Sequence, residues 1–439
     1  MAIKRSPSSA SATIFEFPSN GSKRGSSFLE DSFTSKPDWS QLHSELLELI
    51  LSKLSLVQII RFKAVCSSWR SIAESYVSSS CYAPFPQTPW LLLPPNQEDD
   101  TDSRCFFSLE DKKVYQIKNM GNQFGCDVWR VGSSHGWLLV LDDEANPFLF
   151  NPFSQVRIRL PTLEIFMFEV NRSYFIQELR KFFITKAVLL SDPSRDKNYG
   201  VLVIFGYRSR LAFCAKTGSC WTVLNGASQG YSDIICSNDI VYALTLDNSI
   251  EVWDFHACLP RKRREIHPLI PKNMVEATES FRGSHSSQSY LVESSGDLLL
   301  VMRYVGNFVN QEGEPVDETY LLSDEDTQPL VCPYQTLMFH VYKLDYNEQK
   351  WVEVDNLKNE ALFLGGNHSM SLSAQEFSGF ERNCIYFTDD NWNLMNGDYL
   401  YGGHDFGKFS LEDKTVKPFY ACDLGRIDPP PFWIIPNPW

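Results

Sequence analysis

Pairs of short strands joined by polar turns recur along most of this 439-residue chain, and they constrain its fold more than any other feature. From about residue 84 onward, apolar runs of strand length alternate with turn residues, and no long stripe shows the helical period. Five stretches read as a strand, a polar turn and a second strand: Phe106–Ile117, Phe148–Leu160, Leu211–Leu224, Phe339–Val354 and Phe409–Phe419. Single apolar strands stand between these pairs, at Gly136–Leu141, Ile240–Leu246, Asp297–Arg303 and Asn383–Thr388.

Units of this kind recur roughly every 40 to 60 residues, which is typical of the blades of a β-propeller. Residues 84–439 would hold roughly six or seven blades of about 50 residues each. The predicted fold class is therefore mainly β, a small helical unit followed by a β-propeller of about six or seven blades. A β-sandwich followed by a second β domain is the alternative, but hairpin signals that continue from end to end favour one ring.

Two short apolar strands lie at the ends of this region and are predicted to close the ring. Pro89–Pro94 reads PWLLLP and Phe432–Pro436 reads FWIIP, and neither has enough sequence around it to make a complete blade. Open sheet edges invite aggregation, so propellers usually close by joining distant chain segments in one blade. We expect both strands to lie in the same blade or in neighbouring blades.

Residues 38–76 differ from the rest of the chain because their apolar residues follow helical spacing. One run has the stripe of a single amphipathic helix: Leu42, Leu46, Leu49, Ile50 and Leu54. A second run repeats at threes and fours: Ile59, Phe62, Val65, Cys66, Trp69 and Ile72. Further apolar residues are left over: Leu47, Leu51, Leu56, Val57 and Ile60. A unit of about 40 residues cannot bury all of this surface, so the surplus implies a partner surface.

This helical segment resembles an F-box. Glu45-Leu46-Leu47 matches the first helix of that family, and Val65-Cys66-Ser67-Ser68-Trp69-Arg70 matches its closing motif, although His43 stands where the family usually has proline. The resemblance implies docking onto the Skp-type adaptor of a cullin–RING ubiquitin ligase. It also implies the adaptor-binding residues, which are Leu42, Glu45, Leu46, Leu49, Ile50, Val65, Cys66, Trp69 and Arg70. The alternative is an ordinary helical hairpin packed on the larger domain.

The rest of the chain is similar to the plant β-propeller called the KIB type. The resemblance rests on Ser134–Leu138, Leu149–Phe153, Pro429–Trp433 and, most clearly, the block Val341–Asp389. An F-box followed by this propeller is the commonest arrangement in that family. The predicted domains are therefore a disordered, serine-rich segment at 1–36, an F-box at 37–80 and a KIB-type propeller at 84–439.

Charge and motifs argue against several classes of function. The net charge of −14, with +2 in residues 1–36 and a balanced helical segment, leaves −16 for residues 77–439. Such an acidic body repels phosphate backbones, so nucleic acid is not expected as a partner. No apolar run approaches the roughly 18 residues of a membrane helix, and no cysteine or histidine cluster has zinc spacing. We therefore expect neither a membrane partner nor a metal ligand.

No catalytic residue and no cofactor are predicted either. Phosphate-binding, dinucleotide-binding and hydrolase motifs are missing from the sequence. Gly365-Gly366 followed by His368 and Ser369 could form an oxyanion loop beside a nucleophile. A blade turn that needs glycine for a positive φ is the better interpretation of the same residues.

The predicted function is the substrate-recognition subunit of a Skp–cullin–F-box ubiquitin ligase, with an unknown protein substrate on the propeller. The alternatives are a propeller enzyme or small-ligand binder with a structural F-box, and an organellar protein whose F-box is vestigial. Ligase partners favour the nucleus and cytoplasm, whereas the basic, serine-rich residues 1–36 would also fit organelle targeting. Arg261–Arg264 fits either a nuclear import signal or a solvated loop between blades.

Overall fold

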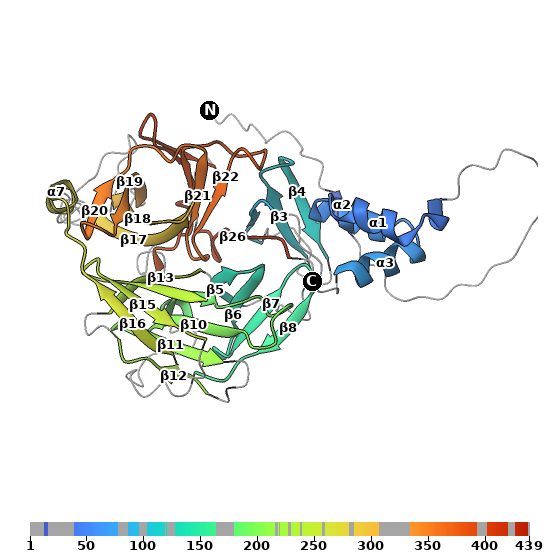
Figure 1. Ribbon diagram of the computed structural model, residues 1–439, viewed down its shortest axis with the longest axis horizontal. Helices are drawn as coiled ribbons and strands as arrows, with labels where there is room; N and C mark the ends of the chain where they lie inside the picture. The colour runs from blue at the N-terminus through green and yellow to red at the C-terminus, as the bar shows by residue number, and fades with distance from the viewer. Residues whose placement is uncertain are drawn as a thin grey trace, which may run out of the picture.

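The computed structural model describes residues 13–15, 39–77, 87–163, 180–306, 334–392, 402–419 and 426–437, apart from short internal gaps at 96–102, 119, 121–127, 216–217, 219, 227–229, 238, 257–259 and 281–284. A small group of helices stands beside a ring of sheets (Figure 1). The predicted disorder of residues 1–36 falls outside the described residues except at β1 (Thr13–Phe15). These three residues pair in parallel with β4 (Lys113–Ile117), and the predicted disorder of the rest of the segment stays a prediction.

The helical unit has a core of its own. It consists of a 3-10 turn and three helices: η1 (Trp39–Gln41), α1 (Ser44–Leu51), α2 (Leu56–Lys63) and α3 (Ser67–Val77). The predicted single stripe from Leu42 to Leu54 is longer than α1, because the chain turns out of the helix at Ser52. A capping box of Ser55 and Gln58 begins α2. The buried side chains that hold the three helices together are Leu47, Leu51, Ile59, Phe62 and Ala73.

The ring is a β-propeller of six blades, so the predicted fold class is confirmed and the blade number is six. From the centre outward, blade 1 has β26 (Phe432–Ile434), β2 (Trp90–Leu92), β3 (Arg104–Ser108), β4 and β1. Blade 2 has β5 (Trp129–Ser134), β6 (Trp137–Leu141), β7 (Pro147–Asn151) and β8 (Val156–Arg159). Blade 3 has β9 (Ile184–Leu189), β10 (Gly200–Phe205), β11 (Arg210–Ala215) and β12 (Thr222–Val223).

Helix α7 (Lys272–Ser280) lies between blades 4 and 5 in the chain. Blade 4 has β13 (Tyr231–Ser237), β14 (Ile240–Thr245), β15 (Ile250–Asp254) and β16 (Arg261–Ile266). Blade 5 has β17 (His285–Ser294), β18 (Asp297–Gly306), β19 (Gln335–Asp345) and β20 (Lys350–Glu353). Blade 6 has β22 (Met370–Ser373), β21 (Glu360–Leu364), β23 (Cys384–Phe387), β24 (Gly407–Ser410) and β25 (Thr415–Pro418). Its β21 and β23 are parallel, whereas every pair in blades 2 to 5 is antiparallel.

The five predicted hairpins are confirmed. Four of them form the outer pair of a blade, whereas in blade 1 the β3–β4 hairpin is followed outward by β1. The four predicted single strands are confirmed as β6, β14, β18 and β23, which lie further in. The outer pair of blade 4, β15 and β16, was not among the predicted hairpins. The basic residues Arg261–Arg264 belong to β16, so their interpretation as a loop between blades is wrong.

The ring closes as the sequence predicts. In blade 1, β2 from the start of the propeller pairs antiparallel with β26 from its end, and Leu91 stands opposite Trp433. The C-terminal segment also reaches blade 2, where the Asn437 amide donates to the His135 carbonyl at 2.7 Å. Distant chain ends therefore share one sheet, and the central edge of blade 1 is covered.

Helix α2 connects the helical unit to the propeller (Figure 1). Its Ile59 and Phe62 face the helical core, whereas Val57 belongs to the buried cluster that contains Trp90 and Tyr115 of blade 1. Ile60 packs against the same cluster. The two units therefore share an apolar contact.

Candidate adaptor surface and the polar centre of the propeller

Helix α1 has two apolar faces, and only one of them is buried. Leu47 and Leu51, one turn apart, point into the helical core. Leu46, Leu49 and Ile50 lie on the other face and are 50%, 61% and 39% exposed. A helix in a globular protein normally has one apolar stripe, so the second stripe is surface that water does not favour.

Two further apolar side chains of the helical unit are exposed. Val65, between α2 and α3, is 58% exposed, and Trp39 of η1 is also exposed. Glu45 in the first turn of α1 is exposed as well. The structure thus leaves four of the predicted adaptor residues as exposed apolar groups, and they are Leu46, Leu49, Ile50 and Val65.

The other predicted residues stabilise the helical unit itself. Leu42 packs partly buried against its core. The Cys66 sulfur accepts the Trp69 backbone N–H at 3.5 Å, and the Arg70 side chain donates from Nε to the Lys63 carbonyl at 3.3 Å. The Trp69 ring lies 4.4 Å from the Phe62 ring, between centroids. Cys66, Trp69 and Arg70 thus stabilise the corner between α2 and α3. Contact of these three residues and Leu42 with an adaptor stays a prediction.

The structure also reassigns the residues that the sequence left over as surplus. Leu47 and Leu51 form the helical core, and Val57 is covered by the propeller. The signal for the first pair was present, because Leu47 and Leu51 have the i, i+4 spacing of a helix face. No local pattern marks Val57 as a contact to a distant sheet.

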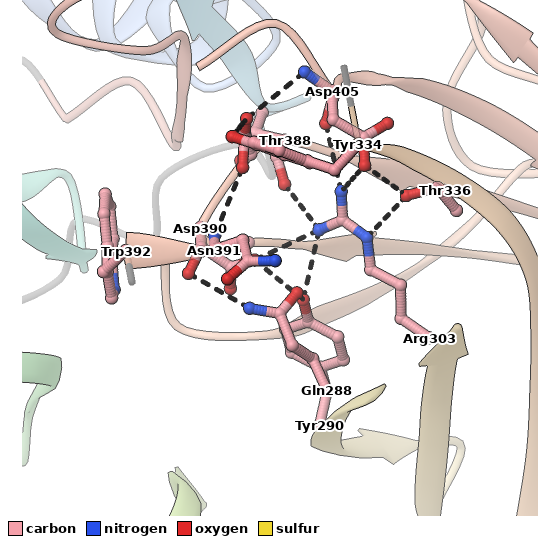
Figure 2. A network of polar contacts seen from close by, with 12 residues as sticks. Gln288, Tyr290, Arg303, Tyr334, Thr336, Thr388, Asp390, Asn391, Trp392 and Asp405 are labelled. Atoms are coloured by element: carbon pink, nitrogen blue, oxygen red, sulfur yellow. Dashed lines mark hydrogen bonds and ion pairs between the residues drawn. The ribbon is translucent and has the colours of Figure 1, made fainter. Parts of the chain in front are cut away.

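A polar network occupies the interior between blades 5 and 6, and Figure 2 shows Arg303 at its centre. Arg303 on β18 is fully buried. Its Nη2 donates to the Asp405 carboxylate at 2.9 Å, and its Nη1 donates to the Thr388 carbonyl at 2.9 Å and to Asp390 at 3.1 Å. Its Nε donates to Thr336 at 2.7 Å. Every nitrogen of this guanidinium therefore has an acceptor, as a buried charge requires.

The electrostatics of this network follow from its burial. Desolvation by burial and the neighbouring Asp405 raise the pKa of Asp389 to about 6, and the Tyr334 hydroxyl donates to its carboxylate. Burial by itself would lower the pKa of Arg303, but Tyr290, Asp405 and Asp390 raise it overall. Arg303 therefore stays a cation that holds blades 5 and 6 together.

The loop that carries Gly365, His368 and Ser369 crosses the centre of the ring. The backbone N–H of His368 donates to the Ser133 carbonyl of blade 2 at 2.8 Å. The Nε2 atom of the His368 ring accepts the backbone N–H of Cys236 in blade 4 at 3.3 Å. Burial, with His135 and Lys186 nearby, lowers the pKa of His368 to about 3. The His368 ring is therefore neutral and occupied by a backbone donor, and it is not placed as a base for Ser369.

The structure partly corrects the interpretation of this loop as a blade turn. Gly365 does need a positive φ, at +142°, and an added Cβ would meet Thr388. The loop nevertheless contacts blades 2 and 4 and is more than a turn within one blade. Lys186 of blade 3 joins the same region, since its Nζ lies 3.1 Å from Asp233 and 3.0 Å from the Gly365 carbonyl.

In the part of the chain that the structure describes, no group of three or more His, Cys, Asp or Glu side chains is arranged to hold a metal ion. Within that same part, the helices are all too short or too polar to span a bilayer. The polar centre that the structure describes holds sheets of the propeller together. The outward face of α1 and the Val65 side chain form an apolar surface.

Comparisons with known proteins match both units. The family model described as the KIB1-4 β-propeller matches residues 106–410, and the F-box domain model matches residues 39–78. The chain is 28% identical over 429 residues to "F-box protein SKIP23" of Arabidopsis thaliana, covering 90% of this chain and 95% of that protein. It is 26% identical over 373 residues to "F-box protein KIB3" of the same plant, covering 82% and 73%.

Proposed function

This chain belongs to the KIB1-4 β-propeller family and carries an F-box, and we propose that it is the substrate-recognition subunit of a Skp–cullin–F-box ubiquitin ligase. The pairing of F-box and propeller, and relatives that are F-box proteins, support a substrate-recognition role in general. The observation that carries the finer proposal is the exposed apolar face of α1 with Val65.

In this proposal the F-box binds a Skp-type adaptor, and through it a cullin–RING ligase. The exposed side chains Leu46, Leu49 and Ile50 have the i, i+3, i+4 spacing by which a helix docks into an apolar groove. Covering them removes water from surface that the fold leaves exposed. Val65 extends the same kind of surface at the start of α3.

The propeller would hold a target protein close to the charged conjugating enzyme. Its contribution is proximity, because a tethered substrate meets the reacting centre at a raised effective concentration. Docking of α2 onto blade 1 through Val57 and Ile60 supports this role, since a fixed arm gives the target a defined position. We propose the nucleus and cytoplasm as the places where the chain works.

The test is capture of a purified Skp-type adaptor by the full-length chain. The double variant Leu46→Ala with Leu49→Ala should weaken binding by at least about tenfold, because truncating buried interface anchors costs about 1–4 kcal/mol. The matched control is Leu246→Ala, which truncates another exposed leucine on blade 4. Binding that is equal in the double variant and the control would contradict the proposal.

The full-length chain is the right material for this experiment. An isolated segment of residues 37–80 would expose Val57 and Ile60, which the propeller covers. Whether residues 37–80 suffice for adaptor binding is therefore tested beside the whole chain. If the full chain binds and the segment does not, the α2 contact with blade 1 is part of what keeps the F-box competent.

A further inference from the structure

The outermost strand of blade 4, β16, begins with four consecutive cations, Arg261–Arg264, and all of them are exposed. Lys262 has carboxylate partners within the blade. Its Nζ lies 3.0 Å from an oxygen of Glu251 and 3.1 Å from an oxygen of Glu265. The charge of Lys262 is therefore balanced, and the other three cations, which are all arginines, remain to be explained.

The three arginines lie on the face of blade 4 that turns toward blade 5. Arg261 stands opposite Asp254 on β15, and Arg264 stands opposite Val252. Partners across a ladder share one face of a sheet, and so do residues two apart along a strand. Arg263 reaches the same face, since its Nη2 lies 2.6 Å from Asp254. Val252 belongs to a buried apolar cluster that blades 4 and 5 share, which fixes the direction of this face.

An exposed aromatic ring of blade 5 lies beside these arginines. Tyr346, in the turn between β19 and β20, is 44% exposed, and the Arg264 guanidinium carbon lies 5.8 Å from its ring centroid. Arg263 is paired with Asp254, but among the described residues neither Arg261 nor Arg264 has a carboxylate partner. This margin of the ring therefore carries excess positive charge, although residues 77–439 have a net charge of −16.

Protection of an open sheet edge is the simplest role for charged residues on an outer strand, because they discourage pairing with another sheet. That role requires no particular face of the strand and no aromatic neighbour. It does not account for three arginines on one face with Tyr346 beside them. A surface that is complementary to negative charge accounts for both features.

The chemistry of these side chains indicates the partner. Guanidinium groups bind carboxylates through two parallel hydrogen bonds, and arginine and tyrosine are enriched among the residues that dominate interfaces. A single exposed ion pair contributes little, so the partner needs several carboxylates in one segment. We propose that Arg261, Arg264 and Tyr346 form a docking surface for an acidic segment of the target protein. This inference rests on the proposed function, and it adds where the target meets the propeller and which charge it carries.

The first experiment selects random peptides, displayed on phage, for binding to the full-length chain. We expect the wild type to enrich peptides rich in Asp and Glu, and the double variant Arg261→Gln with Arg264→Gln to lose that enrichment. The matched control, Lys112→Gln with Lys113→Gln, removes two exposed cations from blade 1 and should keep it. Selected peptides without an excess of carboxylates, or equal enrichment on all three proteins, would overturn the proposal.

The second experiment measures the most enriched peptide, in synthetic form, by fluorescence anisotropy. The double variant should bind it at least about tenfold more weakly, and Tyr346→Ala should bind it a few-fold more weakly. Sodium chloride should weaken binding to the wild type, because salt screens exposed charges. Equal affinity of the wild type and the double variant would contradict the proposal. A DNA duplex that displaces the peptide, or a nuclear import receptor that binds these arginines in its place, would also overturn it.

Adaptor capture by the same proteins separates this inference from the proposed function. The double variant should capture a Skp-type adaptor as the wild type does, because β16 belongs to blade 4 and the F-box packs on blade 1. Intact adaptor capture without peptide binding would reject the docking surface alone. Peptide binding without adaptor capture by the wild type would reject the ligase role alone.

Discussion

The F-box and the centre of the propeller invert the usual distribution of side chains in opposite ways. The F-box leaves leucines in water, with Leu49 61% exposed, whereas the propeller buries Arg303 among carboxylates. Folded proteins normally bury the first kind of group and expose the second. The two sites differ in their neighbouring groups. Arg303 has acceptors within the chain for each of its nitrogens, whereas the described residues leave the Leu49 side chain exposed. The buried cation of the propeller centre is satisfied within the described chain, whereas the F-box leaves apolar surface uncovered.

The strongest way to break this comparison is to remove the strand that closes the propeller. Deleting residues 429–439 takes away Phe432, Trp433 and Ile434, which are all buried in blade 1. Losing three such side chains costs on the order of 10 kcal/mol, which is comparable with the whole stability of a domain. We expect aggregation or loss of cooperative unfolding, measured by size-exclusion chromatography and calorimetry. A monomer with unchanged Tm would show that β26 is dispensable.

The next largest effect is expected from Arg303→Ala. This change leaves the buried Asp405 and Asp390 without their cation, which typically costs about 3–5 kcal/mol. The control is Arg263→Ala, which breaks an exposed pair with Asp254 and should cost about 0–1 kcal/mol. Urea unfolding of both variants measures the difference. Similar losses in both would mean that the polar centre contributes no more than a surface ion pair.

The two faces of α1 give a sharper test within one helix. Leu47→Ala should lower the free energy of unfolding of the F-box by about 2–5 kcal/mol, because the side chain is fully buried. Leu49→Ala, on the exposed face, should change it by about 0.5 kcal/mol or less. Far-ultraviolet circular dichroism during thermal unfolding reports the helices. Equal destabilisation by the two changes would contradict the assignment of an outward face.

The pH dependence of stability tests the charged centre. The folded pKa of Asp389 is about 6, whereas an unfolded aspartate titrates near about 4. Between these values the folded chain binds the extra proton, so the contribution of Asp389 to stability falls as pH rises from about 4 to 6. The free energy of unfolding in urea of the wild type, minus that of Asp389→Asn, should fall by about 3 kcal/mol over this pH range. A flat difference curve would place Asp389 at an ordinary pKa.

The smallest effect is expected from His43→Pro at the start of α1. His43 has φ of −62°, which proline adopts without strain, and its side chain is exposed with only a 3.9 Å contact to Glu45. The substitution should raise stability by about 0.4–1 kcal/mol by restricting the unfolded chain, with adaptor capture equal or slightly stronger. Differential scanning fluorimetry and the capture assay measure both. A clear loss of capture would show that His43 makes a contact of its own.

Features with a local cause were the ones that the sequence could predict. One hairpin in each of five blades was identified because two apolar strands and the polar turn between them lie within about a dozen consecutive residues. The two helical runs of the F-box were visible for the same reason. The polar centre was not predicted, because Arg303 and Asp405 stand 102 residues apart and neither carries a motif.

The sequence by itself determined that this chain has a helical unit with surplus apolar surface and a ring of β hairpins closed by its two ends. Periodicity and turn chemistry are properties of neighbouring residues, so they can be read before folding. Only the tertiary structure decided which leucines of α1 face outward and that Val57 belongs to the propeller. It also decided that the buried Arg303 has an acceptor for each of its three nitrogens. These environments depend on which residues from distant parts of the chain pack beside each side chain. Burial then determines the free-energy cost of leaving a polar group without a hydrogen bond.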